Sequence, residues 1–253
     1  MRTIDLNADL GEGLNNDEEL MKCISSANIA CAAHAGDRNT MVKSVKLAIE
    51  AGVSIGAHIS YPDKLNFGRV DLFDQLDLED LQKSLINQME ILRQICEQFS
   101  VIMNHVKPHG ALYNRAAKDI RVSDMVCDCI IAFDPQLILF GLSGSQMEKS
   151  AKNSGIYFVN EVFSDRSYES DGSLTPRNIP GAVHETVDLA LKQALRIAKK
   201  STVMSRQNTE VKLKAESICV HGDGKEAVNV AKSLVSMLQN ENIRIEAPQF
   251  SKT

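Results

Sequence analysis

The chain has 253 residues with 43% hydrophobic content, which is enough for a sizeable core and fits one large α/β domain. Its net charge of −5 argues against a nucleic-acid-binding or membrane-surface protein, because such proteins usually carry a basic face. The sequence shows no apolar signal region and no apolar stretch of membrane-spanning length, and its six cysteines form no C-x-x-C pair. We therefore expect a cytoplasmic protein with reduced thiols, which binds a small molecule and neither nucleic acid nor membrane.

The first half of the chain alternates short apolar strands with amphipathic helices. We predict strands at 3–7, 27–31, 53–57 and 102–107, and helices at 16–23, 40–51 and 77–100. Gly52 should stop the second of these helices, and Asp77 should cap the third. The loop at 59–76 is long for a compact domain, and loops of that length are often functional.

The second half continues the same alternation. We predict strands at 136–141, 156–161, 217–220 and 243–245, helices at 123–133, 143–154 and 185–200, and a last helix that ends near Gln239. The segment 162–183 should be a second long loop, 201–216 a small hairpin, and the chain from about 247 a polar tail. Seven or eight such units predict one closed or distorted β/α barrel over residues 1–253.

Polar side chains gather where the predicted strands end, which in α/β barrels is the active-site rim. Five of the six histidines lie there, and only His184 lies elsewhere. The residues at these ends are Asp5, Asn7 and Asp9; His34 and Asp37; His58; His105, Lys107 and His109; Ser143 and Ser145; Glu161 and Asp165; and His221 and Asp223. One or two of these histidines are expected to be structural, but the set as a whole favours a functional site.

The run from Asn104 to Tyr113 is the densest part of this rim. If it stays extended up to Pro108, the side chains of His105, Lys107 and His109 point the same way. Two imidazoles beside an ammonium suit an anionic substrate or a proton transfer. Lys107 would then clamp a carboxylate or phosphate, and the alternative is a set of solvated polar residues in a loop.

The rim residues allow two kinds of chemistry. Asp5, Asn7, Asp9, His34, His58 and the other imidazoles could ligate a divalent metal, with Asp9, His34 and His58 as the core of the set. The same groups could act as general acid and base without a metal. No tight metal-binding spacing such as H-E-x-x-H decides between the two.

Two further features would suit an anionic ligand. The turn Gly141–Ser145 stands before a predicted helix, so backbone N–H groups of Ser143, Gly144 and Ser145 could hold a phosphate, although a lone turn of this kind is more often structural. Arg69, Arg166 and Arg177 supply cations in an otherwise acidic chain, with surface salt bridges as the alternative.

Taken together, these runs resemble the LamB/YcsF family, whose members are assigned as the A subunit of 5-oxoprolinase. The resemblance extends in order from Thr3 to about Ile245. The matching runs are 5–13, 26–31, 34–37, 56–58, 61–63, 67–69, 105–114, 161–166, 171–177, 180–182 and 219–223. The sequence departs from the family pattern at Ala32 and Ala33, where Gly-Phe is usual, and at Ile59, where Pro is usual.

The resemblance implies a distorted seven-stranded (β/α) barrel, similar to the glycoside hydrolase/deacetylase superfamily. It also implies ATP-dependent opening of 5-oxoproline to L-glutamate in a complex with the B and C subunits of 5-oxoprolinase, with ATP as co-substrate and a divalent metal left open. We assign catalysis to Asp5, Asn7, Asp9, His34, His58, His105, Lys107 and His109. We assign substrate or phosphate binding to Glu12, Asp37, Arg69, Ser143, Gly144, Ser145, Asp165, Arg166, Arg177, His221 and Asp223.

Two other functions stay open at this point. One is a metal-dependent amide or carbohydrate hydrolase or deacetylase, which would need no ATP. The other is a binding subunit with the chemistry elsewhere. The sequence does not identify the general base, and it does not say whether this chain binds ATP or a metal.

Overall fold

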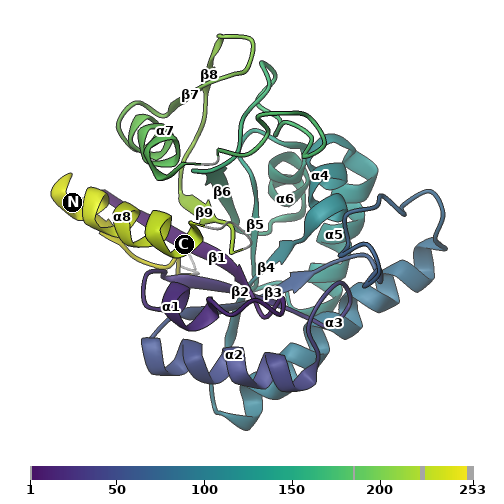
Figure 1. Ribbon diagram of the computed structural model, residues 1–253. Coiled ribbons are helices and arrows are strands. Elements are labelled where there is room, and N and C mark those ends of the chain that lie inside the picture. The colour runs from purple at the N-terminus through teal and green to yellow at the C-terminus, as the bar shows by residue number, and fades with distance from the viewer. Residues whose placement is uncertain (1, 185, 223–225, 250–253) are drawn as a thin grey trace.

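The computed structural model of the chain describes residues 2–184, 186–222 and 226–249. Seven parallel strands close into a barrel, because the first strand pairs with both the second and the last of them (Figure 1). In spatial order these strands are β1 (Arg2–Leu10), β2 (Ser26–Ala30), β3 (Ser54–Ile59), β4 (Met103–Pro108), β5 (Ile138–Leu142), β6 (Phe158–Phe163) and β9 (Ser217–Val220). The predicted distorted seven-stranded barrel is confirmed.

The helices lie around the outside of the barrel (Figure 1). They are α1 (Asp17–Met21), α2 (Arg38–Ala51), α3 (Leu78–Gln98), α4 (Gly110–Lys118), α5 (Ile120–Phe133), α6 (Gln146–Ser154), α7 (Val187–Lys200) and α8 (Ala227–Asn240). A hairpin of β7 (Thr202–Met204) and β8 (Glu210–Lys212) follows α7, and β10 (Ile243–Ile245) extends the sheet beside β1. Within the described residues, no helix is both long and apolar enough to cross a membrane.

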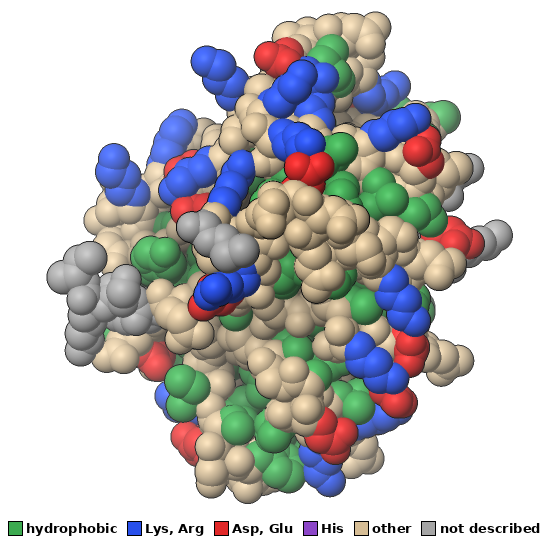
Figure 2. Space-filling model, turned by 90° about the vertical axis from the view of Figure 1, so that its left-hand side faces the viewer, with side chains coloured by type: hydrophobic (Ala, Val, Ile, Leu, Met, Phe, Trp, Pro, Cys, Tyr) green, Lys and Arg blue, Asp and Glu red, His purple; other side chains and the backbone are tan. Residues whose placement is uncertain are grey.

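The seven barrel strands carry two kinds of side chain, because alternate residues of a strand face opposite ways. On β1, Leu6 and Ala8 belong to the apolar core, whereas Asp5, Asn7 and Asp9 find their hydrogen-bond partners on other barrel strands. The space between barrel and helices is therefore apolar, and part of the barrel interior is polar. On the face drawn in Figure 2, Lys and Arg side chains are interspersed with Asp and Glu.

Most predicted elements are confirmed, and so are the caps at Asp77 and Gly52. One helix was missed: His109 begins α4, where Pro108 and Gly110 indicated a loop. Gly110 permits this turn with a φ of +55°, and a Cβ there would lie 2.6 Å from the carbonyl oxygen of Gly68. The missed helix turns the chain sharply at His109 and brings Tyr113 back over the barrel mouth.

Gly56 on β3 makes room for the ring of His105 on the neighbouring strand β4. A Cβ atom at position 56 would lie 2.1 Å from His105 Nε2. The ring of His105 is fully buried and also packs against Phe140 on β5, with 4.4 Å between the ring centroids. The imidazole therefore fills space that a side chain at position 56 would need.

We predict that Gly56→Ala lowers the free energy of unfolding by about 1–3 kcal/mol, because the methyl group overpacks the barrel interior. Urea unfolding of the variant would measure this loss. In a His105→Ala background, Gly56→Ala should lower the free energy of unfolding much less. Equal costs in the two backgrounds would show that the contact with His105 is not the cause.

Candidate functional site

A pocket of about 560 Å³ opens at the carboxyl ends of the barrel strands. Its wall combines acidic, basic and imidazole side chains from the strand ends with residues of the two long loops and of α4. The predicted residues that line it are Asp9, Glu12, His58, Arg69, Lys107, His109, Arg166, Arg177 and His221. The barrel therefore brings together at one rim residues that lie more than 200 positions apart in the sequence.

Lys107 occupies the floor of this pocket and is 2% exposed. Its Nζ lies 2.7 Å from Glu161 Oε1, 2.9 Å from Asp9 Oδ1 and 3.2 Å from Asn7 Oδ1. Burial alone would lower the pKa of Lys107, but Asp9 and Glu161 raise it well above its usual value. Lys107 is thus a buried, charged group and not a solvated loop residue.

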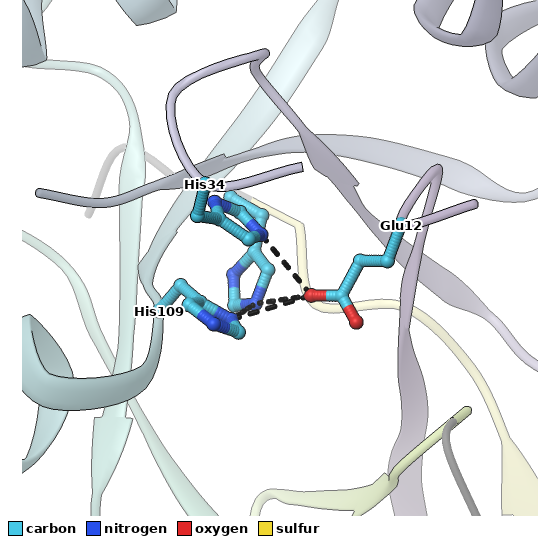
Figure 3. A group of neighbouring side chains, drawn as sticks. Glu12, His34 and His109 are labelled. Atoms are coloured by element: carbon cyan, nitrogen blue, oxygen red, sulfur yellow. Dashed lines mark hydrogen bonds and ion pairs between the residues drawn. The ribbon is translucent and has the colours of Figure 1, made fainter. Parts of the chain in front are cut away.

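Beside this ion pair, three histidines surround the carboxylate of Glu12. Figure 3 shows this carboxylate pointing at His34 and His109. Glu12 Oε1 lies 3.1 Å from His34 Nε2, 3.3 Å from His109 Nδ1 and 3.8 Å from His58 Nε2. The rings of His34 and His109 stack with 3.8 Å between their centroids. Burial lowers the pKa of both histidines, which favours their neutral form.

These four residues form a group that could hold a metal ion. The sequence predicted His34 and His58 for such a group but placed Asp9 in it. The group in the structure holds Glu12 in place of Asp9, one oxygen of which pairs with Lys107, and its third imidazole is that of His109. Asp9 nevertheless stays close, since its Oδ2 lies 3.4 Å from His58 Nε2.

Two residues predicted to be catalytic lie deeper in the barrel and do not line the pocket. Asp5 accepts hydrogen bonds from the hydroxyls of Ser25, Ser26 and Ser217. His105 Nε2 lies 2.8 Å from Asn28 Oδ1, and burial lowers the pKa of this histidine to about 3. His105 therefore stays neutral near pH 7 and does not line the pocket, which argues against the catalytic role predicted for it.

Two further residues predicted to be catalytic lie just outside the pocket wall. The first is Asn7, whose Oδ1 accepts a hydrogen bond from Lys107, which lines the pocket. His34 is similar, since it lies behind the pocket wall, stacked on His109.

The predicted phosphate turn lies outside the pocket. Ser143 Oγ accepts from the backbone N–H of Lys214, and the N–H of Gly144 donates to Glu148 Oε2 at 3.2 Å. A carboxylate already occupies this turn and would repel an anion, and Ser145 merely begins α6. Ser143, Gly144 and Ser145 are not among the residues that line the pocket, and phosphate binding at this turn stays a prediction.

The three remaining residues assigned to substrate binding, which are Asp37, Asp165 and Asp223, have different outcomes. Asp37 caps α2 by accepting from the backbone N–H of Thr40, and it is not part of the pocket wall. Asp165 contacts His221 Nδ1 at 2.9 Å and so supports a pocket residue from outside. Although burial would raise the pKa of Asp165, His221 lowers it below the usual value. Asp223 lies outside the described residues.

Two residues that the structure brings into the site were not assigned a role from the sequence. Tyr113 lines the pocket and donates its hydroxyl to Glu161 Oε2 at 2.7 Å, while Glu161 is fully buried beside Lys107. Glu161 had been noted at a strand end. Tyr113 follows His109 by four residues, a helical spacing that would have placed both on one face if α4 had been recognised.

A sequence model of the LamB/YcsF family matches residues 4–252. The chain belongs to that family. It is 42% identical, over 97% of its length and 96% of the relative's, to a protein of Halalkalibacterium halodurans that is named as the A subunit of 5-oxoprolinase.

Solved structures similar to this LamB/YcsF member agree with the fold. The crystal structure of the lactam utilization protein from Thermus thermophilus superposes with a TM-score of 0.90 at 33% identity, covering 97% of this chain and 100% of that one. A deacetylase with bound substrate gives a TM-score of 0.50 at 17% identity, covering 96% and 87%. At that identity the second likeness concerns the barrel alone.

One departure from the LamB/YcsF pattern has a visible structural consequence. Ala32 adopts a φ of +64°, a left-handed conformation that favours glycine, which is the residue that the resemblance led us to expect here. This turn immediately precedes His34. The turn that positions His34 is therefore kept, and the left-handed backbone of Ala32 costs about 1–2 kcal/mol.

Asp5 supplies a prediction about stability. Burial raises the pKa of its carboxyl from 3.8 to about 6, more than the serine hydroxyls lower it. Between these two values the folded chain binds a proton more tightly than the unfolded chain, so stability is lost as the pH rises through that window. The full shift corresponds to about 3 kcal/mol.

We therefore predict that Asp5→Asn removes part of the pH dependence of unfolding. Urea unfolding of both proteins at pH about 4.5 and about 7.5 should show the native chain losing about 2 kcal/mol relative to the variant. Parallel pH profiles for the two proteins would contradict the assignment, because every other titrating group is common to both.

Proposed function

We propose that this chain is one component of an ATP-dependent 5-oxoprolinase, in which the lactam ring of 5-oxoproline is opened to L-glutamate. The support comes from full-length relatives at 42% identity that are named as the A subunit of 5-oxoprolinase, together with the pocket that the barrel forms. That pocket combines buried acid–base groups with cationic side chains, which is what an anionic lactam requires.

The chemical difficulty is the stability of the lactam. Its amide resonance makes the ring carbonyl a poor electrophile near neutral pH. Transfer of the γ-phosphoryl group of ATP to the lactam oxygen gives ADP and an imidate phosphate, whose carbon water attacks more readily. The carbon–nitrogen bond then breaks as the ring nitrogen gains a proton. A second water hydrolyses the resulting acyl phosphate to L-glutamate and phosphate.

The proton transfers in this sequence fall to the groups around Asp9. Asp9 and His221 line the pocket, and either side chain can accept a proton from an attacking water. Tyr113 lines the same pocket and stays protonated, because burial and Glu161 raise its pKa well above its usual value. The pocket thus offers both proton acceptors and a hydroxyl donor.

Cationic groups on the pocket wall suit the two anionic parts of the reacting species. Arg69 and Arg177 come from the two long loops, and Lys107 lies at the floor. A guanidinium binds a carboxylate or phosphate through paired N–H groups, and a buried ammonium stabilises charge that develops on a bound oxygen. We assign Arg69 and Arg177 to the substrate carboxylate and phosphate, and Lys107 to the reacting centre.

Partner proteins are required by this proposal, because the reaction consumes ATP and the sequence contains no P-loop or other recognised nucleotide motif. We predict that the purified chain alone releases little glutamate from 5-oxoproline and ATP, and that the B and C subunits restore turnover. Glutamate and ADP release, measured with and without the partners, test this. Full ATP-dependent turnover by the isolated chain would refute the need for partners, and hydrolysis without ATP would favour a metal-dependent amide hydrolase.

Lys107 gives the sharpest test of this assignment. We predict that Lys107→Met lowers kcat of the reconstituted complex roughly 10²-fold or more, because the reacting centre loses its buried cation. This substitution also leaves the buried Glu161 carboxylate without its cationic partner, which destabilises the fold. The double variant Lys107→Met/Glu161→Gln relieves that cost, so it should regain stability without regaining turnover.

Lys83→Met is the matched control, since Lys83 lies on α3 with its side chain 65% exposed. It should keep both kcat and the melting temperature of the native chain. If the folded double variant turned over at the native rate, Lys107 would have no part in the mechanism, and a binding subunit with its chemistry elsewhere would be favoured.

A further inference from the structure

The imidazoles of His58 and His109 are held in defined tautomers by backbone carbonyls. His58 Nδ1 lies 3.0 Å from the carbonyl oxygen of Lys107, and His109 Nε2 lies 2.9 Å from the carbonyl oxygen of Phe67. A carbonyl oxygen can only accept a hydrogen bond, so His58 Nδ1 and His109 Nε2 must each carry a proton. In the neutral rings, the other nitrogen of each histidine is then an unprotonated acceptor.

Those two acceptor nitrogens face each other. His58 Nε2 and His109 Nδ1 are 2.9 Å apart, and the carboxylate oxygen Glu12 Oε1 lies 3.3 Å from the latter. Two lone pairs and an anionic oxygen in contact repel one another unless a positive charge lies among them. A single proton would bridge one pair of these atoms, whereas a metal ion can contact all three of them.

The spacing of the donor atoms fits a metal ion. Zinc binds imidazole nitrogen at about 2.0–2.1 Å in tetrahedral sites, which puts neighbouring donors about 3.3–3.4 Å apart. Four separations in this group are 2.9, 3.1, 3.3 and 3.8 Å, and every pair of donor atoms lies within 4.8 Å. We propose that Glu12, His34, His58 and His109 together bind one Zn²⁺ ion.

The charge of the surroundings favours a divalent cation. The adjoining side chains of Asp9, Glu12 and Glu161 are at most 9% exposed, and the ammonium within this buried group is that of Lys107. Asp9 and Glu161 pair with this ammonium, whereas the ion-pair contacts of Glu12 with described residues are to the three imidazoles. A bound Zn²⁺ would balance the charge of the Glu12 carboxylate, and neutral imidazoles are the form of histidine that ligates metals.

A neighbouring group of possible ligands, Asp9, Cys219 and His221, is a weaker candidate. Lys107 Nζ already lies 2.9 Å from Asp9 Oδ1 and 3.2 Å from Cys219 Sγ, so an ammonium occupies the place of a metal. Burial also raises the pKa of Cys219, which keeps it a thiol, whereas zinc binds the thiolate. The proposal therefore concerns the Glu12 group alone.

The site would tie four successive parts of the barrel together, since its ligands follow or end β1, β2, β3 and β4. Zinc bound there would stabilise the folded chain and polarise a group that enters the pocket beside it. The inference does not depend on 5-oxoproline being the substrate. Its test measures metal binding and thermal stability, so its failure and that of the proposed function are separable.

The experiment uses the full chain, stripped with a chelator and titrated with Zn²⁺ against a chromophoric competitor at pH about 7.5, where the ligands are unprotonated. We expect one tightly bound ion per chain and a higher melting temperature once it is bound. His109→Gln and Glu12→Gln should weaken binding roughly 100-fold or more and abolish the rise in melting temperature.

The matched control is His184→Gln, because His184 lies outside the site and contacts Gln193. It should bind Zn²⁺ as the native chain does. Melting curves of the stripped proteins verify that each variant folds, and anomalous scattering from a Zn²⁺-soaked native crystal locates the ion independently of any variant. Absence of a bound ion, equal affinity in the His109→Gln variant, or an ion found elsewhere would each overturn the proposal.

Discussion

The buried ammonium of Lys107 is the interaction on which the interior of this barrel depends. Removing an ammonium from water costs several kcal/mol, so a charge at this depth persists only where carboxylates and hydrogen bonds replace the lost water. Lys107 comes from β4, while its partners Asp9 and Glu161 come from β1 and β6 on either side of β9. The ion pairs therefore cross the barrel and connect opposite walls. This explains why the interior carries polar side chains where most β/α barrels stack Val, Ile and Leu.

Such an interior is stable only if nearly every polar atom has a hydrogen-bond partner, and Asn7 makes several of these hydrogen bonds. Its amide group donates to Glu161 and Ser217, while its oxygen accepts from Lys107 and from Asn28. Asn28 in turn donates to Asp9 and contacts His105 Nε2. One connected network thus runs from His105, below the pocket, to the groups that line it. A network of this kind is stabilising when satisfied and costly when broken, which gives His105 a structural importance although it lacks a place in the pocket.

Much of this arrangement could be predicted from residue spacing. Asp5, Asn7 and Asp9 alternate on one strand, and His105 and Lys107 alternate on another, so their shared faces follow from the geometry of a strand. The depth of each side chain in the barrel does not follow from spacing. Residues i and i+2 lie about 6.6 Å apart along a strand, and the tilt of the strands decides which layer of side chains reaches the solvent. This is why Lys107 reached the pocket and His105 did not. The place of Glu12 among the histidines could not be predicted from strand spacing either, because Glu12 follows the end of β1. It lies in a turn between Gly11 and Gly13, which both have positive φ.

Asp9 connects the two parts of the site, which are the ion pair of Lys107 and the histidine group. Its Oδ1 pairs with Lys107, and its Oδ2 faces His58, so a single carboxylate borders both the ion pair and the histidine group. Any shift of Asp9 must therefore disturb two sets of contacts at once. Its position follows from the pairing of β1 with β2 on one side and β9 on the other, which fixes the register of the strand from both edges. A slip of one residue would turn Ala8 or Leu10 inward, leaving Lys107 without Asp9 and without Asn7. The closure of the barrel is thus what holds the charge arrangement of the pocket in place, and the buried charges in turn strongly favour the register in which the barrel closes.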